Sequence, residues 1–376
     1  MEQVEQTASQ SNAAPDSQRI LSIDVLRGFD MFWIVGGAGF VATILPFCGP
    51  TVEHALRPQL DHVAWAGFHF CDLIFPLFVF IVGMTTVFSL TKTLAQHGKG
   101  EAYWRLLRRT VVLFLLGIYA SEGMAHCWPD VRLLGVLQRI ALCYFFTGLI
   151  FMHFRWRGIL VISIVILVGY WAWLSFVPVP GLGRVPIEPG RNWSNYLDAQ
   201  FLPGRKYDGW DPEGYLSTFP AIVSCLLGVL AAEFLRNPRF SDRVKVGGFI
   251  AAGLLCLLLG YAWGMQFPIV KKIWTSSFVL VAGGYSCLLL GVFYLVVDVW
   301  KLQRWSLPFV WIGANAITLY MLRNMVDFDG LAARIVGCDI QRATGRVGTM
   351  LLMGLSVGMV IAVGRFLYKH KIFLRI

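Results

Sequence analysis

The sequence predicts an all-α, polytopic membrane protein with about ten transmembrane helices, and three observations lead to that prediction. Hydrophobic residues make up 57% of the 376 residues and charged residues only 14%, whereas about a quarter of the residues in soluble domains are charged. The mean hydropathy is +0.63. Apolar stretches of roughly the 20 residues that a helix needs to cross a bilayer recur along the chain, which leaves little sequence for a separate soluble domain.

The ten predicted spans follow one another with polar connections between them. They cover residues 25–47, 72–94, 103–120, 133–153, 159–177, 216–235, 244–264, 274–297, 307–326 and 347–368. The third has the shortest uncharged core. Its basic residues Arg105, Arg108 and Arg109 lie in the first turns and have to extend toward the interface.

The basic residues orient these spans. With the N-terminus inside, Lys and Arg are moderately more frequent in the inner connections than in the outer ones, which places both termini in the cytoplasm. This topology also accounts for the net charge of +10, and no predicted helix has the solvent-facing basic stripe that nucleic-acid binding requires. Residues 1–18 lack the apolar core of a signal peptide. We therefore expect a disordered cytoplasmic tail over 1–18 and a single transmembrane domain over 19–376.

Polar residues within the spans are candidates for function, because an uncompensated charge in the membrane costs about 2.5–3.5 kcal/mol. Asp24 and Arg27 are three residues apart, on one face of a helix, where they can form an ion pair. Gln138 and Arg139 lie near the start of the fourth span, and Asn315 lies in the ninth. The sequence alone leaves two interpretations open, helix packing and a ligand path.

The segment before the second span combines His62 and Trp65 with Asp72 at the start of the span. A carboxylate at this position can simply satisfy free backbone N–H groups and the helix dipole. The spacing of His54, His62 and His69 is not that of a compact ligand set, so no metal site is predicted. The sequence also has no P-loop, GxSxG or HExxH motif.

Taken in order, these segments resemble the heparan-alpha-glucosaminide N-acetyltransferase family, in particular its bacterial NagX-like transmembrane acyltransferases. The resemblance covers nearly the whole chain from Arg19. Its motifs are Arg19-x-x-Ser22-x-Asp24-x-x-Arg27-Gly28, His62-x-x-Trp65, Asp72 to Gly83, Val131 to Arg139, Asp211-Pro-Glu-Gly214, Trp274 to Leu280, Pro308 to Asn315 and Lys369 to Ile376.

The resemblance implies an enzyme of a bacterial inner membrane that transfers an acetyl group from cytosolic acetyl-CoA to the amine of a glucosamine-type sugar at the outer face. His62 matches the essential histidine of the family, which would act as a general base or carry the acetyl group itself. Asp72, or alternatively Asp61, is expected to orient this imidazole, and Asp72 is preferred because the matched motif includes it. The expected partners are the bilayer, acetyl-CoA and an amino-sugar acceptor, with no metal and no nucleic acid, and a homodimer would be in keeping with the family.

The hypothesis of such an enzyme also assigns residues to the donor and the acceptor. Arg105, Arg108 and Arg109 would neutralise the phosphates of CoA, as guanidinium groups do well, and anchoring at the inner face is the alternative role for each of them. The other residues expected along the donor path are Asp24, Arg27, Gln138, Arg139 and Asn315. Family members carry an Asn late in the first span where this chain has Gly36-Gly-Ala-Gly39, so Asn315 or Gln138 would have to hold the acetyl carbonyl.

Acceptor binding is expected at the outer face. The candidate residues there are Asp61, Trp65, Asp211 and Glu213, because carboxylates and aromatic faces suit an amino sugar that is cationic before it reacts.

A secondary transporter for amino sugars is the competing prediction. It would use Asp24, Arg27, Arg139 and Asn315 as a polar path through the bilayer. Two observations favour the enzyme. The sequence has no convincing internal repeat, although many transporters are built from repeated halves, and a transporter has no evident need for His62 in an outer loop.

Overall fold

The computed structural model describes residues 20–121, 123–125, 127–207 and 209–373. The predicted tail over residues 1–18 lies outside the described residues. The described part of the chain is helical and contains isolated β-bridges but no strand, which confirms the predicted all-α class.

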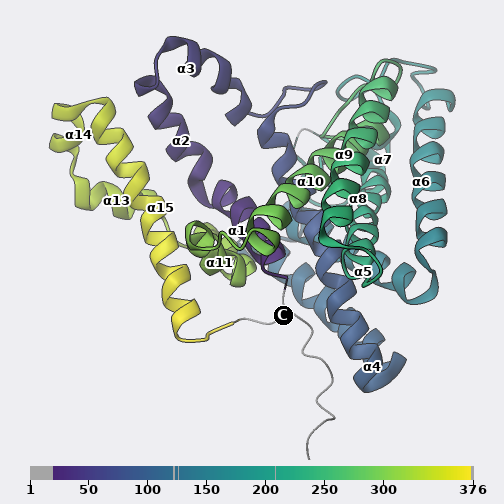
Figure 1. Cartoon of the computed structure of the whole chain (residues 1–376). Coiled ribbons are helices and arrows are strands. Elements are labelled where there is room, and N and C mark those ends of the chain that lie inside the picture. The colour runs from purple at the N-terminus through teal and green to yellow at the C-terminus, as the bar shows by residue number, and fades with distance from the viewer. Residues whose placement is uncertain (1–19, 122, 126, 208, 374–376) are drawn as a thin grey trace, which may run out of the picture.

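The helices form a bundle that is accompanied by a second, smaller group (Figure 1). The helices are α1 (Leu21–Phe32), α2 (Ala38–Ile44), α3 (Pro50–Leu56), α4 (Phe70–Ala120), α5 (Val136–His153), α6 (Trp156–Phe176), α7 (Trp193–Phe201), α8 (Tyr215–Leu235), α9 (Asp242–Gly264), α10 (Ser276–Phe293), α11 (Leu307–Ala314), α12 (Ala316–Met325), α13 (Phe328–Val336), α14 (Cys338–Thr344) and α15 (Arg346–Lys369). Among the described residues, eight helices are long and apolar enough to cross a membrane, and the α11–α12 pair, bent by 68°, makes a ninth if it is one span.

The long helix α4 is in fact two arms. Gly98 interrupts it with φ 78° and ψ −175°, a left-handed conformation that glycine adopts without a steric penalty. Arg105 donates to the hydroxyl of Thr93 at 2.9 Å, although twelve residues of straight helix would span about 18 Å. The arms therefore fold back on each other and correspond to the predicted spans 72–94 and 103–120. Counted separately, they bring the crossing segments to the predicted ten.

The connections divide the bundle into two ends (Figure 1). One end of the bundle contains the Gly98 bend, the start of α1 and the end of α15. The connections at this end are short, and we call it the short-loop end. The opposite, long-loop end carries the connections at 48–69, 121–135, 177–214, 265–275 and 326–345. This arrangement puts His62 and Gly98 at opposite ends of the first arm of α4.

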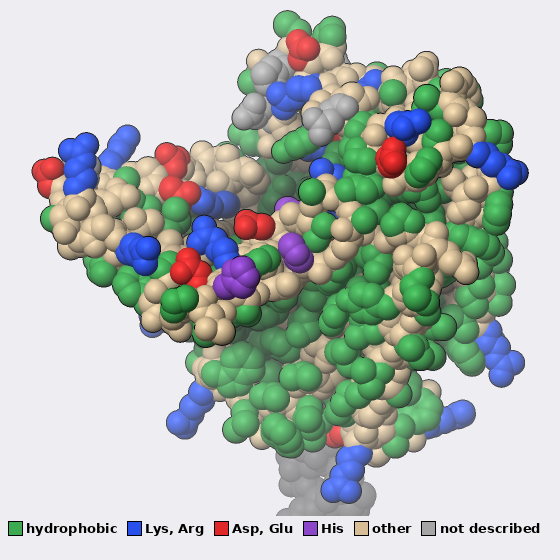
Figure 2. All heavy atoms as spheres, turned by 90° about the horizontal axis from the view of Figure 1, so that it is seen from above, with side chains coloured by type: hydrophobic (Ala, Val, Ile, Leu, Met, Phe, Trp, Pro, Cys, Tyr) green, Lys and Arg blue, Asp and Glu red, His purple; other side chains and the backbone are tan. Residues whose placement is uncertain are grey.

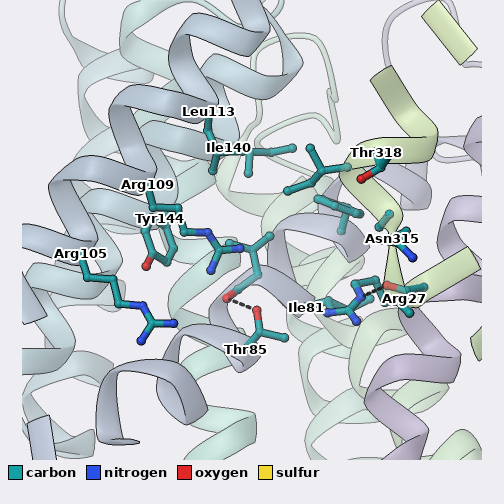
Figure 3. Close-up of a pocket in the computed structure, with 16 residues that line it drawn as sticks. Arg27, Ile81, Thr85, Arg105, Arg109, Leu113, Ile140, Tyr144, Asn315 and Thr318 are labelled. Atoms are coloured by element: carbon teal, nitrogen blue, oxygen red, sulfur yellow. Dashed lines mark hydrogen bonds between the residues drawn. The ribbon is translucent and has the colours of Figure 1, made fainter. Parts of the chain in front are cut away.

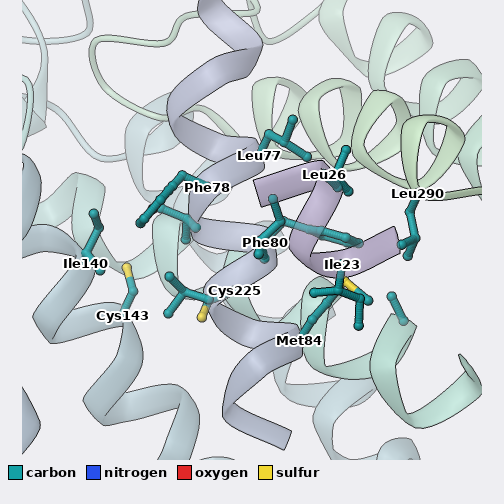
Figure 4. Packing of buried hydrophobic residues seen from close by; sticks show 14 of the residues in the cluster. Ile23, Leu26, Leu77, Phe78, Phe80, Met84, Ile140, Cys143, Cys225 and Leu290 are labelled. Atoms are coloured by element: carbon teal, nitrogen blue, oxygen red, sulfur yellow. The ribbon is translucent and has the colours of Figure 1, made fainter. Parts of the chain in front are cut away.

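The first arm of α4 is at the centre of the apolar core. Leu77, Phe80 and Met84 are fully buried there and pack in one cluster with Leu26 of α1 and Cys225 of α8 (Figure 4). The arm also contacts α5, α8 and α10. Its orientation is thus determined by several neighbouring helices, which gives the residues along it a rigid support.

Two glycines allow α4 and α8 to cross closely. A Cβ atom on Gly83 would lie 1.9 Å from the carbonyl oxygen of Cys225, and one on Gly228 would lie 1.9 Å from that of Phe80. Small residues at such crossings let helix backbones approach within a membrane. The crossing leaves no room for a methyl group on either helix.

We expect Gly83→Ala and Gly228→Ala to lower the free energy of unfolding by about 1–3 kcal/mol, because overpacking forces the backbones apart. Thermal unfolding in detergent measures the effect. Gly247→Ala is the matched control, since a Cβ atom there meets nothing within 4 Å and alanine favours a helix. Equal melting temperatures for all three variants would contradict this account of the crossing.

Candidate active site

Asp72 pairs with His62 at the long-loop end. The carboxylate lies in the first turn of α4 and accepts the backbone N–H groups of His69 at 3.1 Å and of Val63 at 3.3 Å. His62 Nδ1 lies 2.9 Å from Asp72 Oδ1. An ionised carboxylate favours the tautomer that carries its proton on Nδ1, which leaves the lone pair on Nε2. The side chain of His62 is 62% exposed and that of Asp72 is 2% exposed, so a buried carboxylate orients an accessible imidazole.

The segment that carries His62 is tied to the loop between α9 and α10. The N–H of Gly67 donates to the carbonyl oxygen of Ile269 at 2.9 Å, and Ala66 forms an isolated antiparallel bridge with Val270. The indole N–H of Trp65 donates to the carbonyl oxygen of Ile187 at 2.8 Å. Trp65 therefore anchors this segment to the 177–214 connection.

Lys271 is a member of this cluster that sequence reasoning missed. Its Nζ lies 3.2 Å from His62 Nδ1 and 3.4 Å from Asp72 Oδ1. Burial lowers the pKa of the Lys271 ammonium below its ordinary value, while the charge of Asp72 opposes that change. In the sequence, Lys271 is only one of two adjacent basic residues in an outer connection, more than 200 residues after His62. Its closeness to the Trp274 motif was the one available signal.

Arg132 holds the two carboxylates that were expected to bind the acceptor. It donates to Asp211 through Nε and Nη2, both at 2.7 Å, and to Glu213 at 2.6 Å. Burial alone would lower the pKa of Arg132, but the two carboxylates raise it above its ordinary value. Burial also raises the pKa of Glu213. The side chain of Asp211 is thus fully buried and forms a bidentate ion pair with Arg132.

Asp61 lies in a different place from this ion-pair cluster. Together with Glu53, His54, Arg57 and His69 it borders an open groove of about 630 Å³ beside α3. Seen from the long-loop end, acidic, basic and histidine side chains gather on this face (Figure 2). The residues expected at the acceptor side therefore divide into a buried ion-pair cluster and an exposed groove.

A cavity of about 210 Å³ lies farther along the first arm of α4, away from His62. Arg105 and Arg109 reach it from one side, and Arg27 and Asn315 from the other (Figure 3). This cavity therefore brings together four of the eight residues that were expected to bind the donor.

Neighbouring groups hold each arginine of the cavity. Asp24 accepts from Arg27 Nη2 at 2.7 Å, and the carbonyl oxygen of Gly313 accepts from its Nε at 2.6 Å. Arg109 lies over the ring of Tyr144, 4.7 Å from its centroid. The amide nitrogen of Asn315 is buried and has no hydrogen-bond partner among the described residues. The cavity thus offers three guanidinium groups and a spare N–H donor, which fits a polyanionic ligand that carries amides.

A small apolar pocket of about 30 Å³ adjoins the cavity on the side of the His62–Asp72 dyad. Phe78, Ile140 and Ile317 line both spaces, and Phe75 lies at the far side of the pocket, one turn from Asp72. From Thr85 in the cavity to Asp72 the helix rises about 20 Å. An extended arm of pantetheine size spans a distance of that order.

Four other residues expected on the donor path do not line the cavity, namely Asp24, Arg108, Gln138 and Arg139. Arg139 donates to the carbonyl oxygen of Gly214 at 3.3 Å and to the hydroxyl of Ser217, and it lies over the ring of Trp274. Gln138 is buried between the glycines at 117 and 135, and its amide atoms have no partner among the described residues. The sequence predicted that these residues lie near the site, but it did not distinguish them from the residues that line the cavity.

No group of three His, Cys, Asp or Glu side chains that could hold a metal ion occurs in the part of the chain that the structure describes.

Comparison with known families gives these features a common context. Residues 19–260 match the family described as heparan-alpha-glucosaminide N-acetyltransferase, catalytic. The chain belongs to this family. Membership agrees with the resemblance seen in the sequence motifs.

Two curated relatives are similar to the chain, and both are named heparan-alpha-glucosaminide N-acetyltransferase. The mouse protein (Mus musculus) is 27% identical over 327 residues, which cover 71% of this chain and 49% of the relative. The human protein (Homo sapiens) is 28% identical over 324 residues, which cover 69% of this chain and 48% of the relative. The chain thus spans about half the length of the curated relatives it matches.

The part that matches the heparan-alpha-glucosaminide N-acetyltransferase family contains His62, Asp72 and the three arginines of the cavity, whereas Lys271 and Asn315 follow it. The dyad and most of the charged lining of the cavity therefore lie in the matched region.

Asp198 supports this site from α7. Its Oδ1 accepts the backbone N–H of Tyr215 at 2.9 Å, at the start of α8 and beside the carbonyl of Gly214 that Arg139 contacts. Burial raises the pKa of Asp198 from its ordinary value of 3.8 to about 6. A raised carboxyl pKa means that the folded state favours the neutral form, so the stability that this group contributes is full below pH 4 and is lost as the pH rises through about 6.

We expect Asp198→Asn to reduce the pH dependence of stability between pH 4 and 7, because the amide keeps an acceptor for Tyr215 and cannot ionise. In the wild type, ionisation of Asp198 lowers the free energy of unfolding by about 3 kcal/mol as the pH rises over this range. Thermal unfolding in detergent at several pH values measures it. The idea fails if the variant and the wild type lose stability in parallel across this range.

Proposed function

We propose that the protein is a transmembrane N-acetyltransferase that moves an acetyl group from cytosolic acetyl-CoA to the amine of a glucosamine-type sugar at the opposite face of the membrane. One observation carries the proposal. The first arm of α4 starts beside the His62–Asp72 dyad, and the arginine-lined cavity borders the same arm from Phe78 to Thr85, about 9–20 Å from Asp72. A small apolar pocket next to Phe75 and Phe78 lies between them. Membership of the acetyltransferase family supports it.

In this proposal the cavity binds the nucleotide end of acetyl-CoA. Arg27, Arg105 and Arg109 neutralise its phosphates through charge-assisted hydrogen bonds, for which guanidinium groups are well suited. The buried amide of Asn315 donates to a carbonyl of the pantetheine arm. The apolar pocket around Phe78 admits the uncharged part of the arm and brings the thioester toward the dyad.

His62 supplies the proton transfer. As the sugar amine attacks the thioester carbonyl, a C–N bond forms, the C–S bond breaks, and Nε2 takes a proton from the nitrogen and passes it to the departing thiolate. Asp72 stabilises the imidazolium that forms between these steps, as the buried carboxylate of a catalytic triad does. A route through acetyl-imidazole would use the same Nε2 lone pair.

The proposed orientation puts the short-loop end in the cytoplasm of a bacterial cell, with both termini on that side. The support for it is the excess of Lys and Arg in the connections at this end. The acceptor then approaches the long-loop end, where the exposed groove that contains Asp61 opens beside His62. Carboxylates in that groove suit an ammonium group before it loses its proton.

We expect His62→Ala to lower the rate of acetyl transfer from radiolabelled acetyl-CoA to glucosamine by about 10²–10⁴-fold, because the general base is lost. Asp72→Asn should also lower kcat, since the imidazole loses the group that orients it. His97→Ala, at the bend near Gly98, is the control and should keep the wild-type rate.

Transfer should also occur in proteoliposomes that hold acetyl-CoA on one side and glucosamine on the other. Full activity of His62→Ala would rule out its catalytic role. Uptake of unmodified glucosamine without acetyl-CoA would instead favour a transporter.

Removing positive charge from the cavity tests phosphate binding separately from the chemical step. We expect the double variant Arg105→Gln and Arg109→Gln to raise the KM for acetyl-CoA by at least tenfold with a smaller change in kcat, because uniform binding of the phosphates is lost. Arg108→Gln removes one positive charge from the same helix at a residue that does not line the cavity, and the single variants Arg105→Gln and Arg109→Gln are compared with it. Equal KM values for the double variant and Arg108→Gln would argue against phosphate binding in the cavity.

A further inference from the structure

Lys271 is held in place by the backbone around it. Val270, just before it, donates its N–H to the hydroxyl of Thr275 at 2.9 Å, and the N–H of Trp274 donates to the carbonyl oxygen of Lys271 at 3.0 Å. Trp274 has a φ of 52°, which is uncommon for a residue with a bulky side chain. The bridge from Ala66 to Val270 then fixes this tight loop against the segment that carries His62. The backbone contacts of the loop therefore fix the position from which the Lys271 ammonium contacts the dyad.

Lys271 and Asp72 compete for the same atom of His62. Nζ lies 3.2 Å from Nδ1 and Asp72 Oδ1 lies 2.9 Å from it, yet Nδ1 either donates a proton or accepts one. When Nδ1 donates to Asp72, the lone pair is on Nε2, where chemistry needs it. When Nδ1 accepts from Lys271, Nε2 carries the proton and His62 cannot act as a base.

The ammonium also limits how strongly Asp72 can stabilise a charged imidazole. It lies 3.4 Å from the carboxylate oxygen that faces His62, and a positive charge next to a histidine disfavours its protonated form. The ammonium therefore offsets part of the charge that Asp72 presents to the imidazole, and only a neutral imidazole can take a proton or attack a thioester.

We propose that Lys271 is a positioning residue that keeps His62 neutral at rest, by offsetting the charge of Asp72 while Asp72 holds the proton of Nδ1. The role of this neutral imidazole in acetyl transfer rests on the function proposed above, but its protonation state does not.

Other charged or titratable groups surround the dyad. Asp61 and His69 lie on the same segment as His62, and Cys71 lies at the start of α4. Lys271 lies on the α9–α10 loop, Glu213 precedes α8 and Arg132 precedes α5. Glu213 acts electrostatically on Lys271, and Arg132 compensates part of its charge through their 2.6 Å contact. Lys271 is the cation that contacts both members of the dyad.

The test is the reactivity of His62 toward diethyl pyrocarbonate, which modifies neutral imidazole, measured by mass spectrometry of the peptide that contains His62 between pH 5 and 8. In Lys271→Met the midpoint of this reactivity should move to higher pH by about one unit, a tenfold change in the protonation equilibrium. Lys271→Arg retains the charge and should restore the wild-type midpoint. Lys272→Met removes the adjacent charge and is the matched control.

The acid limb of kcat/KM for acetyl transfer should follow the same order among these variants. An unchanged midpoint in Lys271→Met, or an equal shift in Lys272→Met, would overturn the proposal and leave Lys271 a structural residue. Because the modification does not require turnover, a shifted midpoint in a protein that transfers no acetyl group would support this inference and contradict the proposed function.

Discussion

The carboxylate of Asp72 is the group on which the arrangement of the long-loop end depends. One oxygen accepts the N–H groups of Val63 and His69, which fixes the start of α4 and the path of the chain before it. The other oxygen faces His62 and Lys271. An N-terminal helical position already favours negative charge through the free N–H groups and the dipole. The capping interaction and the chemistry of the site therefore require the same ionised state of the same residue.

The rest of the site follows from the rigidity of α4. Its first arm is buried among α1, α5, α8 and α10 and crosses α8 at two glycines, so distances along it are those of an ideal helix. The Gly98 turn then brings Arg105 and Arg109 of the second arm back beside the first. One helical hairpin thus provides the dyad, the two arginines and much of the wall between them, and α1 and the α11–α12 bend close the cavity from the opposite side.

Sequence reasoning predicted the features that depend on local pattern. The ten apolar segments are evident from their length, and the pairing of Asp72 with His62 was foreseen as the way to orient the imidazole. It missed interactions between residues far apart in the chain. Asp298 caps α1 by accepting the N–H groups of Leu21 and Ser22, which is why that helix starts earlier than predicted. Lys271 reaches the dyad by tertiary folding alone, and nothing in the motif around Arg139 indicates that α8 and Trp274 enclose it.

The break between α11 and α12 determines which parts of the cavity lining can be altered by substitution. The helix is interrupted at Asn315, and the carbonyl oxygen of Gly313 accepts from Arg27. Exposed peptide groups within a bilayer are tolerated only where protein or a polar space surrounds them. Part of the hydrophilic character of the cavity therefore comes from main-chain atoms, which no substitution removes. Substitution of side chains can alter the charge and shape of the cavity, but the carbonyl groups at the break remain part of its lining.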